Sequence, residues 1–349
     1  MLLTHKSLTA RVWLAAAAVV ALAGFALATA PAEAREEVTV NIMISPEGSG
    51  PYNAFAVLQT RAKDNHPWLR PVAIETPGFN YNVSFMAKSP DKWKNTVFGS
   101  GSVVEWAAAN GLAPFYKKPL EEVKNFRIIG VMGVTGNVFV TFDDAIQSPN
   151  DFVGKNVVTG LLSQNEWGMH HRMLLDGWGL TKKLKSFSAL GPRANIQALI
   201  DGRADVGALV LFSPSSFDKV ITPGPFKTIR ATNRKFHFVN IPENMIRDYN
   251  KKTGAIFEVR KYKPGMIPGQ TKAFTTFGDR LLLSAHKDFP EELAYEFAKL
   301  WLKMAPIVAK VNAMGKMWDG KTLASAAEGM RDRLHPGALR AYKELGLIK

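Results

Sequence analysis

The sequence predicts an α/β fold with mostly parallel strands, organised as two lobes. Strand-like segments alternate with helix-like segments, and glycine-bearing loops follow several of the strands. The chain has 349 residues, which exceeds one ordinary core and suits two lobes of ~150 residues. Hydrophobic residues make up 46% and charged residues 21% of the chain, a balance typical of globular proteins rather than disordered or fibrous ones.

The first 34 residues read as a secretory signal peptide. Lys6 and Arg11 precede an apolar run over residues 12–28, and Ala32-Glu33-Ala34 offers small residues for cleavage after Ala34. Cleavage after Ala30 is an alternative that would leave Pro31 first, and an uncleaved anchor is another. No other window approaches the ~18 apolar residues of a spanning helix. We therefore expect an exported protein.

Cysteine is absent and the charge is basic. Without cysteine, the chain has no disulfide, no thiolate metal site, no Cys nucleophile and no lipoprotein anchor. The net charge of +14 is dispersed in short clusters such as residues 182–185 and 260–263. Such clusters are typical of a solvated surface, or they attract an anionic solute or an acidic partner. Export argues against nucleic acid as that partner.

The N-terminal part repeats the order strand, glycine loop, helix. Residues 38–44 alternate as a strand, Gly48-Ser49-Gly50-Pro51 breaks it, and residues 52–65 carry apolar residues at helical spacing. The order recurs in a strand over 72–75 with a short helix from Asn80. It recurs again in a strand over 96–98, a glycine loop over 99–102 and a helix over 103–110.

The middle part begins with a long β-rich segment over residues 128–142, interrupted by glycines, which is suited to cross between two lobes. A strand over 156–159, a loop over 160–163 and a helix over 164–177 follow. Ser163 and Glu166 have the spacing of a capping box at that helix. A helix over 193–201 and a buried strand over 208–212 complete the series.

The C-terminal part starts with a strand over 281–283 and becomes helical. Leu293, Phe297, Leu300 and Met304 recur at helical spacing, and His335-Pro336-Gly337 precedes a last helix.

Catalytic and metal motifs are missing from the sequence. No histidine pair has H-E-x-x-H spacing, and the adjacent His170 and His171 point about 100° apart on a helix. Gly48-Ser49-Gly50 begins a dinucleotide fingerprint, but Asn53 stands where the third glycine belongs. There is no Walker A lysine and no G-x-S-x-G elbow. We therefore predict no enzyme, no metal and no cofactor.

Short loops rich in Gly, Ser, Asn and aromatic residues lie between strand ends and helix starts in both halves of the chain. In doubly wound sheets ligands lie beyond the carboxyl ends of the strands. The first turn of a helix offers free N–H groups to a carboxylate or phosphate. The loops therefore favour small-molecule binding, although each one alone can be a simple turn or cap.

Several stretches resemble the TAXI family, the solute-binding subunits of one class of tripartite ATP-independent periplasmic (TRAP) transporters. The resemblance spans roughly residues 45–346. The chain departs from the family pattern in the two ligand loops, Gly48-Ser49-Gly50-Pro51-Tyr52 and residues 161–165. The segment Ser89-Pro90-Asp91 also resembles a segment of the tripartite tricarboxylate transporter receptors. The stretches that carry the resemblance are residues 47–52, 151–158, 198–205, 264–270 and 335–344.

The resemblance implies a periplasmic binding protein type II-like fold, with a ligand cleft at the hinge between the lobes. Lobe I would comprise residues 35–138 plus 274–349, and lobe II residues 139–273. The protein would be a periplasmic monomer that captures a small carboxylate or amino acid and delivers it to integral-membrane TRAP permease subunits. The alternatives are a tripartite tricarboxylate-type receptor, a sensory binding module or an exported hydrolase.

The candidate ligand-binding residues come from loops of both lobes. Backbone N–H groups near Ser49 and Ser163 would meet a carboxylate, Arg193 would pair with it, and Phe79 and Trp167 would pack its apolar part. The full candidate set is Ser49, Tyr52, Asn53, Phe79, Asn80, Ser100, Ser102, Ser163, Asn165, Trp167 and Arg193.

Overall fold

The structure is a computed structural model that describes residues 35–349. The signal peptide predicted for residues 1–34 lies outside the described residues. No helix within residues 35–349 combines the length and the apolar character needed to cross a membrane.

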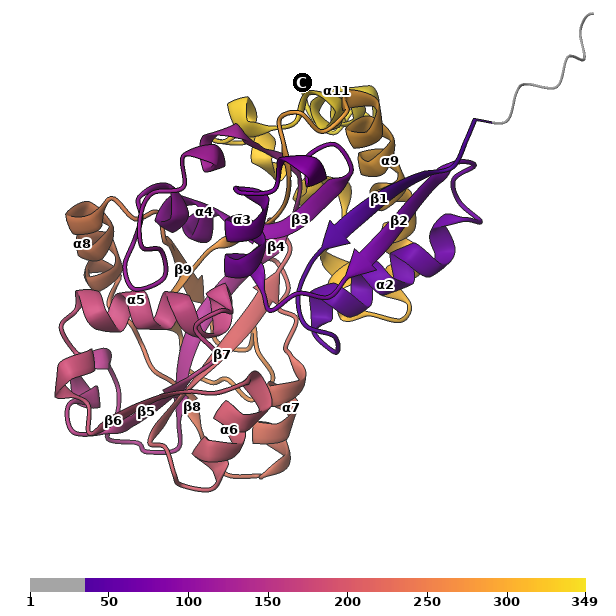
Figure 1. The fold of residues 1–349 in the computed structure, drawn as a ribbon. Helices are drawn as coiled ribbons and strands as arrows, with labels where there is room; N and C mark the ends of the chain where they lie inside the picture. The colour runs from indigo at the N-terminus through magenta and orange to yellow at the C-terminus, as the bar shows by residue number, and fades with distance from the viewer. Residues whose placement is uncertain (1–34) are drawn as a thin grey trace, which may run out of the picture. The chain divides into compact units, whose positions relative to one another are not determined.

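A mixed sheet organises the described chain, and its strands follow the order β2-β1-β3-β11-β4-β7-β5-β6 (Figure 1). Strands β1, β2 and β3 pair in parallel, as do β5, β6 and β7, whereas β11 and β4 run antiparallel to their neighbours. The predicted α/β class is confirmed. The prediction of mostly parallel strands is wrong, because within residues 35–349 four strand pairs are parallel and six are antiparallel, and β4 and β11 take part in most of the antiparallel ones. The strands are β1 (Val38–Met43), β2 (Leu69–Ile74), β3 (Thr96–Gly101), β4 (Phe126–Thr141), β5 (Asn156–Thr159), β6 (Ser186–Ala189), β7 (Val206–Ser213), β8 (His237–Phe238), β9 (Glu258–Tyr262), β10 (Phe274–Gly278) and β11 (Arg280–His286).

Strand β4 belongs to two sections of the sheet. Its first residues pair with β11, up to Val134 opposite Arg280, and its later residues pair with β7, from Val134 opposite Ser213 onward. Gly133 lies at this change of partner with a φ of 145°, a value that favours glycine. We call β2-β1-β3-β11 the first section and β7-β5-β6 with β8–β10 the second section. Asp279 connects β10 to β11, so it is the second place where the chain passes between the sections.

Helices cover both sections. In the first section α2 packs on β2 and on α9, and α11 packs on α9 (Figure 1). A core that includes Phe98 of the first section and Phe139 of β4 is shared by both sections. The helices are α2 (Gly50–Ala62), α3 (Phe79–Met86), α4 (Ser102–Ala109), α5 (His170–Gly177), α6 (Pro192–Ile200), α7 (Gly224–Ala231), α8 (Glu243–Thr253), α9 (Glu291–Ala309), α10 (Gly320–Leu323) and α11 (Pro336–Glu344).

The glycine loop predicted over residues 99–102 is wrong. Strand β3 runs through Gly101, and α4 begins at Ser102 without an intervening loop. The glycines are there for close packing: a Cβ at Gly99 would lie 2.5 Å from Phe79 Cε1 and 2.7 Å from Ile44 Cδ1. A segment rich in glycine and serine is typical of a turn, so composition alone predicts a loop here.

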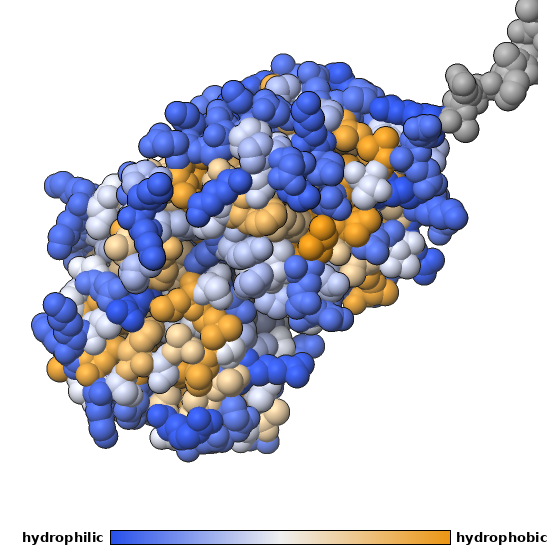
Figure 2. Space-filling model, in the orientation of Figure 1, coloured by the Kyte–Doolittle hydropathy of each residue, from blue (hydrophilic) through white to orange (hydrophobic). Residues whose placement is uncertain are grey.

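Figure 2 shows mostly hydrophilic side chains on one face of the molecule, with separate hydrophobic patches between them. This distribution is that of a solvated surface.

Candidate functional site

A cleft of about 800 Å³ lies where loops of both sections meet. The loop after β1 contributes residues 46–51, and the second section contributes residues 191–194, residues 221–225 and Lys227. Gln164, Trp167 and residues 312–314 complete the wall. The lining therefore comes from strand-to-helix loops that are far apart in the sequence, as expected for an α/β ligand site.

Three helices begin at this cleft. Ser49, Gly191 and Pro223 precede the first residues of α2, α6 and α7, and all three line the cleft. None of the three helices has an acidic residue in its first turn, so their partial positive ends are not offset by a carboxylate of their own. Arg193 and Lys227 add full positive charges, against the single acid Glu47.

The loop before α2 is held by two serines. Ser49 Oγ accepts a hydrogen bond from the Tyr52 backbone N–H at 3.4 Å, which caps the helix, and lies 2.6 Å from Ser45 Oγ. Serine at this position satisfies a first-turn N–H that the helix itself leaves open. The cap fixes the direction in which α2 enters the cleft wall.

A smaller recess of about 90 Å³ adjoins the cleft and shares Ser49, Gln164, Trp167 and Phe212 with it. Its own lining adds Phe79, Leu281, Asn165 and Glu166. Aromatic rings therefore line the recess beside a carboxylate. Within residues 35–349, the buried Oε1 of Gln164 has no hydrogen-bond partner.

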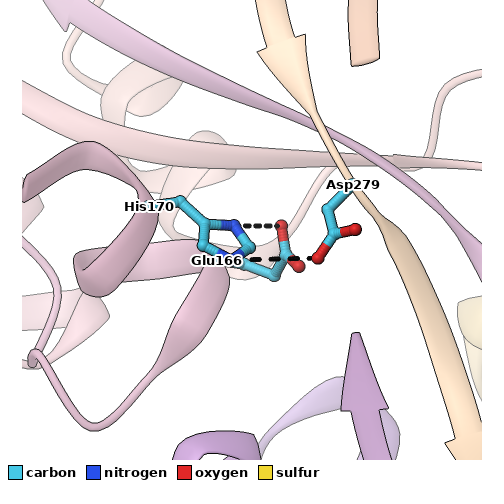
Figure 3. A group of neighbouring side chains, drawn as sticks. All are labelled: Glu166, His170 and Asp279. Carbon is cyan, nitrogen blue, oxygen red and sulfur yellow. Dashed lines mark ion pairs between the residues drawn. The ribbon is translucent and has the colours of Figure 1, made fainter. Parts of the chain in front are cut away.

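Behind the recess, Glu166, His170 and Asp279 form a buried cluster (Figure 3). Both carboxylates lie on the same side of His170 (Figure 3), with Nδ1 3.6 Å from Glu166 Oε2 and Nε2 3.8 Å from Asp279 Oδ2. Glu166 lies in a π-helical turn, Asn165–Met169, which leads directly into α5. The four-residue spacing of Glu166 and His170 puts both side chains on one face of this segment, and Asp279 reaches them from the β10–β11 connection.

Hydrogen bonds hold both carboxylates of this cluster. Thr135 Oγ1 donates to Glu166 Oε2 at 2.7 Å, and Asn165 Nδ2 donates to Oε1 at 2.9 Å. The backbone N–H groups of Val103 and Arg280 donate to Asp279 at 3.1 and 2.7 Å. Val103 is in the first turn of α4. The side chain of Asp279 therefore connects the β10–β11 connection to the start of α4 in the first section.

The two carboxyl groups differ in pKa. Burial opposes the charge of Glu166, but His170 and the hydrogen bonds from Thr135 and Asn137 outweigh it and lower its pKa. Burial and the neighbouring Glu166 charge raise the pKa of Asp279 well above its usual range. Of the two carboxyl groups, Glu166 is therefore the more readily ionised.

The structure brings part of the candidate ligand set to the cleft. Whether any of these residues contacts a ligand stays a prediction. The cleft or recess is lined by Ser49, Asn53, Phe79, Asn165, Trp167 and Arg193. The lining excludes Tyr52, Asn80, Ser100, Ser102 and Ser163.

The residues outside the lining have other contacts. Ser100 is fully buried and donates to Glu105 at 2.6 Å, and Ser102 is buried beside Met330. Asn80 donates from Nδ2 to the Leu162 carbonyl oxygen at 2.8 Å, a contact between the two sections. Half-buried Tyr52 packs against the core of the first section.

The predicted capping box of Ser163 and Glu166 is wrong. The helical segment starts after Gln164, which makes no side-chain cap, and the Glu166 carboxylate points instead to Thr135, Asn165 and His170. The Glu166 side chain does not cap the helix because these side chains offer a buried carboxylate more hydrogen bonds than one backbone N–H does.

Sequence reasoning missed Glu166, Asp279, Gln164 and Lys227. The spacing Glu166-x-x-x-His170 was a readable signal, since residues four apart share a helix face. Asp279 carries no local signal, because its place depends on the pairing of β11 with strands more than a hundred residues earlier.

A protein-family model described as the NMT1-like family matches residues 72–346. The chain belongs to the NMT1-like family. No curated protein matches this NMT1-like chain.

Solved structures similar to this NMT1-like protein have low sequence identity. XAC2383 from Xanthomonas citri bound to ATP is 12% identical with a TM-score of 0.49, covering 88% of this chain and 99% of its own. The periplasmic binding protein BugD is 12% identical with a TM-score of 0.48, covering 89% and 94%. R. palustris Rpa4515 with adipate is 12% identical with a TM-score of 0.47, covering 80% and 88%. At this level the matches carry no information about ligands or partners.

Proposed function

We propose that this NMT1-like protein is an exported receptor that binds a small organic anion or amino acid in the cleft. The observation that carries the proposal is the convergence of three helix N-termini with Arg193 and Lys227 on one cleft of about 800 Å³. Helix N-termini and cationic side chains together stabilise a carboxylate. The aromatic recess would take the apolar part of the solute.

The two sections of the sheet would act as lobes that close on the solute. The chain passes between them near Gly133 on β4 and at Asp279, and such strand connections can serve as hinges. In this arrangement the protein would bind the solute and release it unchanged. The proposal extends to delivery of the solute to a TRAP-type permease from the periplasm, with the protein working as a monomer. The support for that extension is the resemblance to the TAXI family.

The test begins with the solute that the protein retains. Native mass spectrometry of protein purified without refolding should detect a bound acid, and calorimetric titration should then measure its affinity. Arg193→Ala and Lys227→Ala should each weaken binding by roughly ten- to a hundredfold, since a charge-assisted hydrogen bond contributes about 1.5–3 kcal/mol. Lys182→Ala is the matched control, because Lys182 is exposed and outside the cleft lining.

Two results would contradict the proposal. The first is a retained solute that has no acid group and whose affinity is unchanged in the Arg193→Ala/Lys227→Ala double variant. Such a result would mean that the cleft does not bind anions. Conversion of the solute during long incubation with catalytic amounts of protein would identify an enzyme instead.

A further inference from the structure

The geometry points to a binding site for a divalent transition-metal ion, Zn²⁺ or Mn²⁺, formed by Glu166, His170 and Asp279. This inference concerns the cluster behind the recess and does not depend on the solute-binding proposal. The prediction of no metal rested on the histidines alone, since no two of them have metal-ligand spacing and the adjacent His170 and His171 point apart. In the structure the ion-pair partners of His170 are two carboxylates (Figure 3).

The three side chains present potential ligand atoms that all lie within 4.8 Å of one another. Two carboxylates and one imidazole form a mixed oxygen and nitrogen donor set, which suits Zn²⁺ or Mn²⁺ better than the all-oxygen set that Mg²⁺ or Ca²⁺ prefers. Across an ion with bonds of about 2.1 Å the ligand atoms are roughly 3–3.5 Å apart. Binding would therefore draw these side chains slightly together.

Within the described part of the chain, two buried polar atoms at this cluster have no hydrogen-bond partner. Nε2 of His170 has none, and neither does Oδ1 of Asn137, although both residues are fully buried. Asn137 Nδ2 lies 3.2 Å from His170 Nδ1, so the amide belongs to the same cluster. Unpartnered buried nitrogen and oxygen are uncommon in proteins. A bound cation would satisfy Nε2 directly.

The charges of the cluster also favour a cation. Among residues 35–349, His170 is the one ion-pair partner of either Glu166 or Asp279, and no lysine or arginine pairs with them. Two carboxyl groups are thus buried side by side around a single imidazole. A divalent ion would balance them without a buried lysine or arginine.

The surroundings resemble the outer shell of a metal site. Thr135 and Asn165 donate to Glu166, and backbone N–H groups donate to Asp279. Hydrogen bonds of this kind orient ligating carboxylates. Access is available from the cleft, because Asn165 and Glu166 line the recess that opens into it.

The test uses untagged wild-type protein, stripped with a chelator and then dialysed. Equilibrium dialysis against Zn²⁺ or Mn²⁺ with elemental analysis should give one equivalent of metal per chain and a melting temperature higher by several degrees. Co²⁺ should give visible absorption bands as it binds the same ligands. Glu166→Gln and His170→Gln should each lose the equivalent, the temperature shift and the Co²⁺ bands.

His237→Gln is the matched control. His237 also lies beside a carboxylate, with Nδ1 3.8 Å from Asp144, but His237 is only half-buried and Asp144 is exposed. It should leave the single equivalent unchanged. Wild-type protein without stoichiometric metal overturns the inference, whether or not the variants fold. So does metal binding that persists in both Glu166→Gln and His170→Gln.

Discussion

At the scale of single residues, Gly99 shows how tightly the recess is built. Its missing Cβ leaves room for the Phe79 ring and for Ile44, and Phe79 in turn lines the recess. The glycine is therefore a packing requirement inside a strand, where a backbone turn is not needed.

Gly99→Ala should lower the free energy of unfolding by about 1–3 kcal/mol, since the new methyl group would overlap a buried ring. Gly224→Ala is the matched control, because nothing lies within 4 Å of its Cβ position, and it should be neutral or slightly stabilising. Urea unfolding of both variants measures the difference. Equal stability of the two variants would mean that Phe79 moves aside without cost.

His335 makes the fold sensitive to acid. Burial is the main cause that lowers its pKa from 6.5 to about 4, against a hydrogen bond to the Phe289 carbonyl that raises it. The folded state therefore keeps the imidazole neutral while the unfolded chain takes up a proton. The stability that this neutral form provides is present above pH 6.5 and is lost as the pH falls from 6.5 toward 4.

Between pH 7 and pH 5 this residue should cost the wild type about 2 kcal/mol of unfolding free energy. His335→Asn keeps an acceptor for the Gly337 N–H at the start of α11 but cannot titrate. The variant should be somewhat less stable at pH 7 and should lose about 2 kcal/mol less on acidification. Denaturant titrations at both pH values measure the unfolding free energy of each protein. An identical loss of unfolding free energy in both proteins would mean that His335 does not cause the acid sensitivity.

At the scale of elements, α6 completes the hydrogen bonding of β7. Strand β5 pairs with β7 at Val206 and Gly207, and beyond that point the amide of Asn195 takes over. Its Nδ2 donates to the Ala208 carbonyl at 2.5 Å, and its Oδ1 accepts from the Ala208 N–H at 3.2 Å. A fully buried side chain thus replaces a neighbouring strand.

Asn195→Ala should destabilise the protein by about 2–4 kcal/mol, because it leaves a buried N–H and C=O unpaired. Gln197→Ala, on the exposed side of the same helix, should stay within about 0.5 kcal/mol of the wild type. Thermal and urea unfolding of the pair measure this. A small effect of Asn195→Ala would mean that water replaces the amide.

The elements differ in how far the sequence predicts them. Strands with runs of apolar or β-branched residues, such as β1, β5 and β7, are predictable because one local pattern defines them. Strand β9, with the charged sequence Glu-Val-Arg-Lys-Tyr, and the two-residue β8 were missed, since tertiary pairing alone makes them strands. For the same reason the sequence indicates the loops of the cleft but not the Glu166–His170–Asp279 cluster.

At the scale of the whole molecule, the contact from Asn80 to the Leu162 carbonyl joins the two sections beside the cleft. Its loss should shift the balance toward a more open arrangement by about 1 kcal/mol, roughly fivefold in population. Because the chain lacks cysteine, Lys63→Cys and Lys183→Cys can carry two spin labels without background. Both lysines are exposed, one in each section.

Asn80→Ala in this labelled protein should add longer distances to the measured distribution. Asn110→Ala is the control, since Asn110 bonds only locally to the Trp106 carbonyl in the first section. Identical distributions in all three proteins would show that the Asn80 contact does not hold the sections together.

Strand β11 sits between β3 and β4 but comes much later in the chain. Ser100 and Ser284, whose hydroxyl groups meet 2.9 Å apart, are separated by 184 residues. During synthesis at about 5–20 residues per second, β3 therefore waits roughly 10–40 s for its neighbour. Throughout that interval its edge is open to wrong partners. An intermediate with an unpaired β3 edge therefore persists until residues 280–286 have been made.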